Sequence, residues 1–408
     1  MKTLKSFVLS ALALTAIGLS QAQAQPEYDQ IARGRYIATL GDCTACHTAD
    51  PAKPFAGGIK INTPFGTLVG ANITPDRETG IGRWTFDDFQ RAMTEGVGHD
   101  GKRLYGAMPF TAYTKVSRKD NQDLWAYLQT LQPVHQEINS NQLPFPFNVR
   151  TSLLAWNWLN FDKGEYVPDS SKSADWNRGA YLVEGLGHCG TCHTPKNVLG
   201  GDKSGQFLQG AVVEEWWAPN LTHAEHTGLG KWSEADIVAY LRTGVNRFDI
   251  ASGPMADAVK HSTQHWTDAD LKAVATYLKQ SEPANDDRPA ALAAEDRRMK
   301  IGSQIYEARC SACHVSKGQG EQAIFPQLAN NPLVNAPNAS SLMHVVLAGS
   351  RGVDTDARPT APAMPAFAGT LSDDEIADVL TYIRNSWGNA ASPVSASDVK
   401  EMHETLRK

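Results

Sequence analysis

The sequence predicts a mainly α-helical fold built from three tandem small helical domains. The first observation is a Cys-x-x-Cys-His motif that occurs three times, at residues 43–47, 189–193 and 310–314. The second is a repeat of matching Asn, Trp and Val positions behind the first two motifs. The third is a helical segment before and after each motif. Because repeats at a fixed spacing indicate duplicated domains, we expect one domain for each motif.

The composition narrows the class of protein. The chain has 408 residues, of which 20% are charged and 41% hydrophobic, with a formal net charge of −6. These fractions are too apolar for a disordered chain and too charged for a multi-span membrane protein. No basic block stands out, so nucleic acid is not expected as a partner.

The first 24 residues predict a cleaved secretory signal peptide. Lys2 and Lys5 precede an apolar run over residues 7–19, and Ala22-Gln23-Ala24 follows. The alternative is an uncleaved membrane anchor, but a span needs about 20 apolar residues. No later segment is long and apolar enough to span a bilayer. We therefore expect a periplasmic protein that is soluble or peripherally attached to the outer face of the cytoplasmic membrane.

All six cysteines fall within the three motifs, which argues against the disulfide framework expected of an exported protein. Cys-x-x-Cys-His is the attachment motif of c-type haem. Residues three apart on a helical turn share one face, so both thiols can bond one haem while the histidine reaches its iron. This predicts three covalently bound haem c groups. The attachment residues are Cys43, Cys46, Cys189, Cys192, Cys310 and Cys313, and the proximal ligands are His47, His193 and His314.

Two other uses of such cysteines fit less well. Structural zinc needs a second pair of cysteines or two histidines at each site. A thioredoxin-like redox pair leaves the histidine after every motif unexplained.

A methionine after each motif is the candidate sixth ligand of the iron. In the repeat, Asn72 and Asn220 each lie 12 residues before a tryptophan, Trp84 and Trp232. Met108 then follows His47 by 61 residues, and Met255 follows His193 by 62. In the shorter third copy, Met364 follows His314 by 50 residues. Core packing is the alternative for any of these methionines, and His99 and His261 are rival ligands.

Each domain is expected to open and close with a helix. Gly34, Gly179 and Gly302 lie in the opening helices, and aromatic residues recur in the closing helices around residues 124–128, 271–278 and 376–383. A small residue against an aromatic one permits a close helix crossing. Thr267 and Ser372 are the expected N-caps of the last two closing helices.

These features resemble class I cytochrome c domains and, as a whole, the three-haem cytochrome c subunit of periplasmic, membrane-associated dehydrogenases of the alcohol and gluconate type. The resemblance also involves Asn72-Ile73-Thr74-Pro75-Asp76, residues 217–222 and Pro144-Phe145-Pro146-Phe147. It implies electron transfer from a catalytic subunit, which holds a flavin or quinone cofactor, to ubiquinone or a terminal oxidase. The chain itself is then expected to lack a substrate-oxidising centre.

The expected boundaries follow from the motifs. Domains 1, 2 and 3 cover residues 25–132, 174–280 and 296–390, with a connector at 133–173, a linker at 281–295 and a tail at 391–408. Residues 153–159 of the connector predict a short apolar helix, which either covers the first haem domain or docks to a partner subunit or a membrane surface. In the tail, Val399, Met402 and Leu406 can form a narrow apolar stripe.

Other functions remain open. A free-standing multihaem carrier between respiratory complexes would show the same haem chemistry. A haem enzyme such as a peroxidase needs an open coordination site, which a methionine in every domain opposes. No Ser/His/Asp set, phosphate loop or nucleotide fingerprint is evident.

Overall fold

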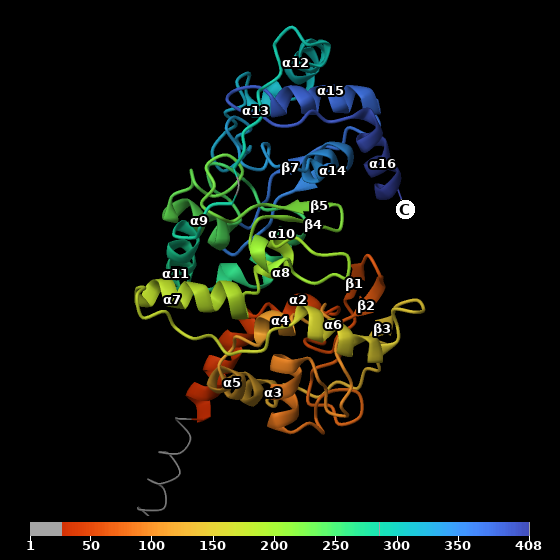
Figure 1. Cartoon of the computed structure of the whole chain (residues 1–408), viewed down its shortest axis with the longest axis vertical. Coiled ribbons are helices and arrows are strands. Elements are labelled where there is room, and N and C mark those ends of the chain that lie inside the picture. The colour runs from red at the N-terminus through yellow and green to blue at the C-terminus, as the bar shows by residue number, and fades with distance from the viewer. Residues whose placement is uncertain (1–26, 285, 408) are drawn as a thin grey trace, which may run out of the picture.

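This computed structural model describes residues 27–284 and 286–407, and helices dominate it. Figure 1 shows the chain stacked along one axis, with the N-terminal third at the bottom, the middle third in the centre and the C-terminal third at the top. The predicted signal peptide, residues 1–24, lies outside the described residues. We call the three parts the first, second and third units, after the motifs that they carry.

The first unit combines helices with a small sheet. Its helices and strands are a helix over 27–40, α2 (Cys43–His47), β1 (Lys60–Thr63), β2 (Gly66–Val69), α3 (Phe86–Glu95), α4 (Phe110–Tyr113) and α5 (Arg118–Leu128). The Thr85 hydroxyl accepts from the Asp88 backbone N–H and so caps α3, while Ser117 caps α5 in the same way.

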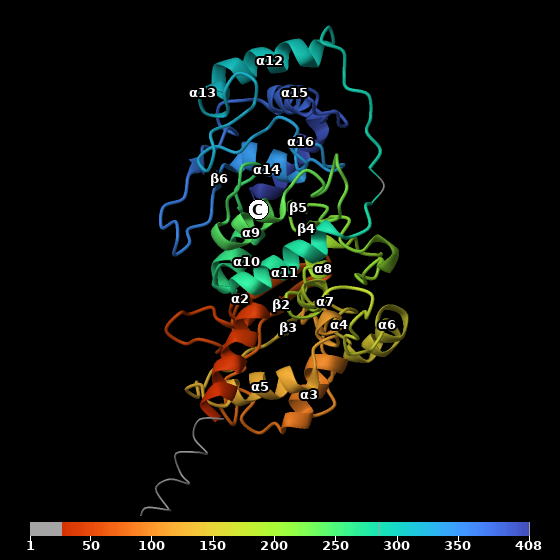
Figure 2. The same ribbon diagram turned by 90° about the vertical axis from the view of Figure 1, so that its left-hand side faces the viewer.

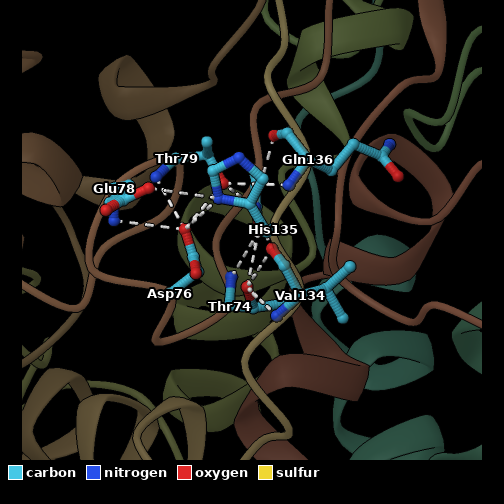
Figure 3. A network of polar contacts seen from close by, with 8 residues as sticks. Thr74, Asp76, Glu78, Thr79, Val134, His135 and Gln136 are labelled. Carbon is cyan, nitrogen blue, oxygen red and sulfur yellow. Dashed lines mark hydrogen bonds and ion pairs between the residues drawn. The ribbon is translucent and has the colours of Figure 1, made fainter.

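The connector is fastened to the first unit at its start. Its strand β3 (Asn141–Gln142) pairs antiparallel with β2, which also pairs with β1. Figure 3 shows a second attachment, where residues 134–136 meet the loop around Thr74 and Thr79. The Val134 N–H donates to Thr74 Oγ1 at 3.2 Å, and the Gln136 N–H donates to Thr79 Oγ1 at 2.9 Å. Sequence reasoning did not anticipate this attachment.

The expected apolar helix of the connector is confirmed. Helix α6 (Leu153–Asn160) follows a single 3₁₀ turn, η1 (Arg150–Ser152). Trp156 lies edge-to-face on Phe110 of the first unit, with ring centroids 6.3 Å apart. The helix therefore does cover part of the first unit.

The second unit repeats this plan with shorter strands, which lie in the middle of Figure 1. Its elements are α7 (Ala174–Tyr181), η2 (Leu182–Leu186), α8 (Gly190–His193), η3 (Ser204–Gln206), β4 (Ala211–Val213), β5 (Trp216–Ala218), α9 (Glu234–Thr243), α10 (Pro254–His261), η4 (Thr263–His265) and α11 (Asp268–Lys279). The linker after α11 runs along the outside of the molecule towards α12, as Figure 2 shows.

The third unit carries the C-terminal helix. Its elements are α12 (Arg297–Arg309), α13 (Ser311–His314), α14 (Ser340–Ala348), β6 (Ser350–Arg351), β7 (Ala363–Met364), α15 (Asp373–Arg384) and α16 (Ala396–Leu406). Val399 of α16 is fully buried, and Met402 and Leu406 pack against the core that Ile376 and Leu380 form. The apolar stripe of the tail is therefore used inside this unit.

One close helix crossing occurs in all three units, as expected. A Cβ atom on Gly34, Gly179 or Gly302 would lie 2.6 to 2.7 Å from the Cβ of an aromatic residue on the closing helix, Tyr127, Tyr277 or Tyr382. The expected N-caps are also confirmed, because Thr267 and Ser372 cap α11 and α15. The sequence pattern thus located the paired helices correctly.

The first and second units share one hydrophobic core, whereas the third unit has its own. One continuous cluster of buried residues runs from Ile37 and Leu128 in the first unit to Leu186 and Leu278 in the second. The third unit has clusters of its own. Met93, Met299 and Met343, which have no counterpart in the sequence repeat, are buried core residues.

Candidate functional site

Each Cys-x-x-Cys-His motif forms a single helical turn. Residues 43–47 make up α2, whereas Cys189 and Cys310 lie at the start of α8 and α13. The His193 N–H donates to the Cys189 carbonyl at 3.0 Å, and the His314 N–H donates to the Cys310 carbonyl at 2.9 Å. This turn places both thiols and the histidine of one motif on neighbouring positions, as attachment of one haem requires.

All six thiols are unpaired, so the cysteines build no disulfide framework. Burial raises the pKa of Cys43 to about 12, and it raises the pKa of Cys46 and of Cys310 to about 11. The thiols therefore stay neutral in the apolar sites where they lie.

The three motif histidines are held in the same way. Nδ1 of His47 lies 2.7 Å from the Ala71 carbonyl oxygen, and Nδ1 of His193 lies 2.7 Å from that of Pro219. Nδ1 of His314 lies 3.0 Å from the Pro326 carbonyl oxygen. A carbonyl accepts only from a protonated Nδ1, which leaves Nε2 free as a ligand atom. Burial lowers the pKa of all three imidazoles and so favours the neutral form.

The repeated Asn-x-Thr segments fix the loops that supply these carbonyls. In the first unit, Asn72 follows Ala71, and its amide donates to the Val134 carbonyl at 2.8 Å and to Thr79 Oγ1 at 3.0 Å. Asn72 Oδ1 accepts from the Thr74 backbone N–H at 3.0 Å. The sequence repeat marked these asparagines, but their role behind the histidine was visible only in the structure.

The equivalent loop of the second unit is tied to the linker instead. Asn220 Oδ1 accepts from the Thr222 N–H at 2.8 Å, and Thr222 Oγ1 accepts from the Ala284 N–H at 3.0 Å. The Asp286 carboxylate accepts from the backbone N–H groups of His226 and Thr227. In both units, the segment that leaves the unit therefore braces the loop behind the proximal histidine.

A cavity of about 450 Å³ joins the second and third motifs. Its lining is mainly apolar and includes the predicted site residues of both units, namely Cys189, Cys192, His193 and Met255, and Cys310, Cys313, His314 and Met364. Met255 lies at the start of α10, and Met364 lies on β7. The structure thus brings each of these two methionines to the cavity that its own motif lines.

The first unit places its predicted residues around the shared core. Cys43 and Met108 both pack against the cluster that contains Ile37 and Leu124. Met108 lies half-buried in the loop before α4, and Pro109 begins the turn that follows it. This arrangement is compatible with the predicted pair of His47 and Met108.

The two rival histidines have other surroundings. His99 Nδ1 lies 2.8 Å from Asp88 Oδ2, and its ring stacks on Trp84. His261 lies at the far end of α10 from Met255, and among the described residues the cavity lining includes its neighbour Ser262 rather than His261. Of the two candidates in the second unit, the cavity lining thus includes Met255, and the methionine ligands stay a prediction.

The first motif lies against the second site. Asp42, which directly precedes Cys43, lines the cavity of the second and third motifs and has a left-handed backbone with φ 48°. Its Oδ1 is buried without a hydrogen-bond partner in the described part of the chain. Burial, together with the charge of Asp257 on α10, raises the pKa of Asp42 to about 8. Sequence reasoning missed this residue, which bears no motif signal.

Buried N–H groups that lack a hydrogen-bond acceptor provide a further test of whether haem fits the cavity. The indole Nε1 atoms of Trp217 and Trp232 are buried, have no acceptor among residues 27–284 and 286–407, and belong to side chains that line the cavity. Buried donors require acceptors, and a haem carries two carboxylates. Thiols in pairs, a neutral imidazole, a thioether, apolar walls and two free donors together suit covalently bound haem.

Comparison with known proteins points the same way. The family described as Cytochrome c matches residues 177–282 and 299–387. The gluconate 2-dehydrogenase cytochrome c subunit of Pantoea cypripedii is 38% identical over 424 residues, which cover 99% of this chain and 95% of that protein. The cytochrome c subunit of alcohol dehydrogenase (quinone) from Gluconobacter oxydans (strain 621H) is 38% identical, with 97% of this chain and 87% of that protein covered. The fructose dehydrogenase cytochrome subunit of Gluconobacter japonicus is also 38% identical, with coverages of 97% and 89%.

Proposed function

The chain belongs to the family of dehydrogenase cytochrome c subunits, and on that premise we propose that it passes electrons from a partner dehydrogenase to an acceptor of the respiratory chain. The single observation that carries this proposal is similarity over nearly the whole chain to subunits of three different dehydrogenases. The partner would hold a flavin or quinone cofactor and oxidise an alcohol, gluconate or another sugar or polyol. The acceptor would be ubiquinone or a terminal oxidase.

The proposal includes three covalent haem c groups. The second and third units match the cytochrome c family, and the first unit shares their motif turn, their histidine–carbonyl contact and their glycine–tyrosine helix crossing. Haem attached there supplies one-electron redox chemistry. The proposed axial pairs are His47 with Met108, His193 with Met255, and His314 with Met364.

The packing of the units suits a stepwise relay. The second and third sites share one cavity, and Asp42 of the first unit reaches the edge of that cavity. Ser262 after α10 donates through Oγ to the Thr39 carbonyl at 2.6 Å, which fixes the first motif against the second unit. The three sites are therefore held in a fixed relation by protein contacts, which favours short paths between neighbours.

We also propose that the protein is exported and works at the outer face of the cytoplasmic membrane. The support is the signal-like pattern of residues 1–24 and the resemblance to subunits of membrane-associated dehydrogenases. In the described part of the chain, every helix falls short of the length and apolar character that crossing a bilayer requires. The attachment that we propose is peripheral.

Affinity purification from native membranes tests the proposal. A flavoprotein or quinoprotein dehydrogenase should co-purify in a fixed ratio with a chain whose intact mass includes three haems. Recovery of the holoprotein without a dehydrogenase would favour the alternative, a free-standing carrier between respiratory complexes. An intact mass with fewer than three haem additions would contradict the proposed stoichiometry.

A further inference from the structure

We propose that the connector between the first and second units docks the protein onto an anionic lipid surface. The docking surface, here called the connector patch, consists of residues 145–149, helix α6 and residues 198–199. Its exposed large apolar side chains are Phe145, Phe147, Val149, Leu154, Trp158, Leu159, Val198 and Leu199. This inference rests on the proposed membrane location and deepens it by assigning the surface and the lipid charge.

The connector patch is one continuous surface although its residues come from two segments. Trp156 Nε1 of α6 donates to the Leu199 carbonyl at 2.7 Å, and the Asn197 amide donates to Asn160 Oδ1 at 2.7 Å. The rings of Phe65 and Phe147 lie 5.1 Å apart. A Cβ atom on Gly200 would lie 3.0 Å from the same Phe65 ring, so Phe65 lies between the segment before α6 and the loop at 198–199. Together these contacts keep the three parts of the connector patch close to one another.

Most of the exposed large apolar side chains lie in the connector patch. Of the 13 exposed large hydrophobic residues in the described part of the chain, eight belong to the connector patch. Trp158 is 84% exposed, Phe145 is 80% exposed and Val198 is 92% exposed. Leu153 is the buried residue of α6, so most of the helix faces outwards. A clustered apolar patch of this kind marks an interaction surface.

The charges around the connector patch indicate that its binding partner is anionic. The chain carries a net charge of −6, yet residues 138–161 contain no Asp or Glu, and Arg150 is their one charged residue. Glu137 and the exposed Asp162 are the acids that bound this stretch. Arg150 donates to the Arg103 carbonyl, which places Lys102 and Arg103 at the margin, and Lys203 follows the loop on the other side. Within the described residues, none of these four cations forms an ion pair, whereas the nearby Asp202 is paired with Lys196.

The combination favours lipid over a protein partner. Side chains that stand out this far suit a deformable acyl and headgroup layer better than a fixed protein surface. Tryptophan, phenylalanine and leucine with a fringe of Lys and Arg are the usual composition of interfacial helices, which lie in the membrane plane. Anionic headgroups would pair with Lys102, Arg103 and Lys203, whereas Arg150 is held by the Arg103 carbonyl and the Tyr105 ring.

Docking would also position a proposed haem site. The Trp156 ring would lie 3.4 Å from a Cβ atom on Gly106, and Trp156 also contacts Phe110. Gly106 and Phe110 flank Met108, the proposed axial ligand in the first unit. Figure 2 shows α6 at the outer edge of the lower part of the molecule, away from α12 of the third unit. The first unit would thus lie next to the lipid, where a membrane-soluble acceptor is found.

Vesicle flotation of the full-length holoprotein tests this surface. The protein should float with vesicles of phosphatidylcholine and phosphatidylglycerol at low salt, and less well with phosphatidylcholine alone or at high salt. The double variant Trp158→Ser/Leu159→Ser should bind at least about tenfold more weakly, since it removes two large apolar side chains whose burial in the lipid favours binding. The variant Lys102→Glu/Lys203→Glu should lose mainly the dependence on the anionic lipid.

The control variant is Val212→Ser, which removes an exposed apolar side chain outside the patch and should leave flotation unchanged. Flotation of the Trp158→Ser/Leu159→Ser variant at the wild-type level would overturn the inference. If the same variant also lost capture of the dehydrogenase, the connector patch would bind protein instead of lipid. Reduction by the dehydrogenase in detergent solution should be the same in all variants, which separates this test from that of the proposed function.

Discussion

Gly179 and Tyr277 lie so close that a Cβ atom on Gly179 would fall 2.7 Å from the Cβ of Tyr277 and 2.1 Å from the carbonyl oxygen of Ala273. The two helices α7 and α11 can therefore cross only where the side chain is a hydrogen atom. The same relation holds between Gly34 and Tyr127 and between Gly302 and Tyr382. It fixes the opening helix of each unit, which lies before the Cys-x-x-Cys-His turn in the chain.

Substitution of this glycine should destabilise the protein. The Gly179→Ala variant forces two backbones apart, and overpacking of this kind costs about 1–3 kcal/mol or more. Thermal unfolding of the holoprotein should show a lower midpoint. Gly369→Ala is the matched control, because a Cβ atom at Gly369 meets nothing within 4 Å. Equal midpoints for the two variants would contradict the close crossing.

Replacing a proposed axial methionine should open one iron. Each of Met108→Ala, Met255→Ala and Met364→Ala should bind carbon monoxide and lower the potential of its own haem, because Met/His ligation raises the potential. Visible spectra and redox titration measure both effects. Met299→Leu, at a buried core position, is the control. An unchanged spectrum and potential for Met255→Ala would mean that another residue, with His261 the first to examine, ligates the second iron.

The side chain of Asn72 should contribute to the stability of the first unit. Asn72→Ala removes the bonds to Val134, Thr79 and Thr74, and loss of buried hydrogen bonds of this kind costs about 2 kcal/mol or more. Denaturant unfolding should show this loss. The exposed Asn62 on β1 provides the control, Asn62→Ala. If both variants unfold at the same denaturant concentration, the brace behind His47 carries no stability.

Asp270 should contribute to the stability of the protein at low pH. Burial acts to raise its pKa, but the hydrogen bonds from Arg178 and Tyr36 outweigh burial and leave the pKa below its ordinary value of 3.8. A depressed folded pKa gives stability that is complete above 3.8 and is lost as the pH falls through the folded pKa. Acid unfolding should therefore be less steep in Asp270→Asn than in the wild type. Identical pH profiles for the two proteins would show that the ion pair of Asp270 and Arg178 contributes nothing to stability.

Sequence reasoning succeeded where local chemistry decides the structure. Helix caps at Thr267 and Ser372 and the apolar helix at α6 depend on near neighbours, and they were located correctly. The cavity shared by the second and third motifs was not foreseen, because it depends on how distant segments pack. The continuous core from Ile37 to Leu278 was missed for the same reason. Asp42 carries no repeat signal, so its place beside the second site appeared only in three dimensions.

The most direct test of the account is reduction of the purified holoprotein by substrate, followed by visible absorbance. Mixed with alcohols, gluconate or aldose sugars, the chain alone should stay oxidised, although dithionite reduces it. Addition of its cognate dehydrogenase should then reduce three haems per chain, and the pair should pass electrons to a quinone analogue. Reduction of the purified chain by substrate, with no flavin or quinone cofactor present, would contradict the claim that this protein only relays electrons.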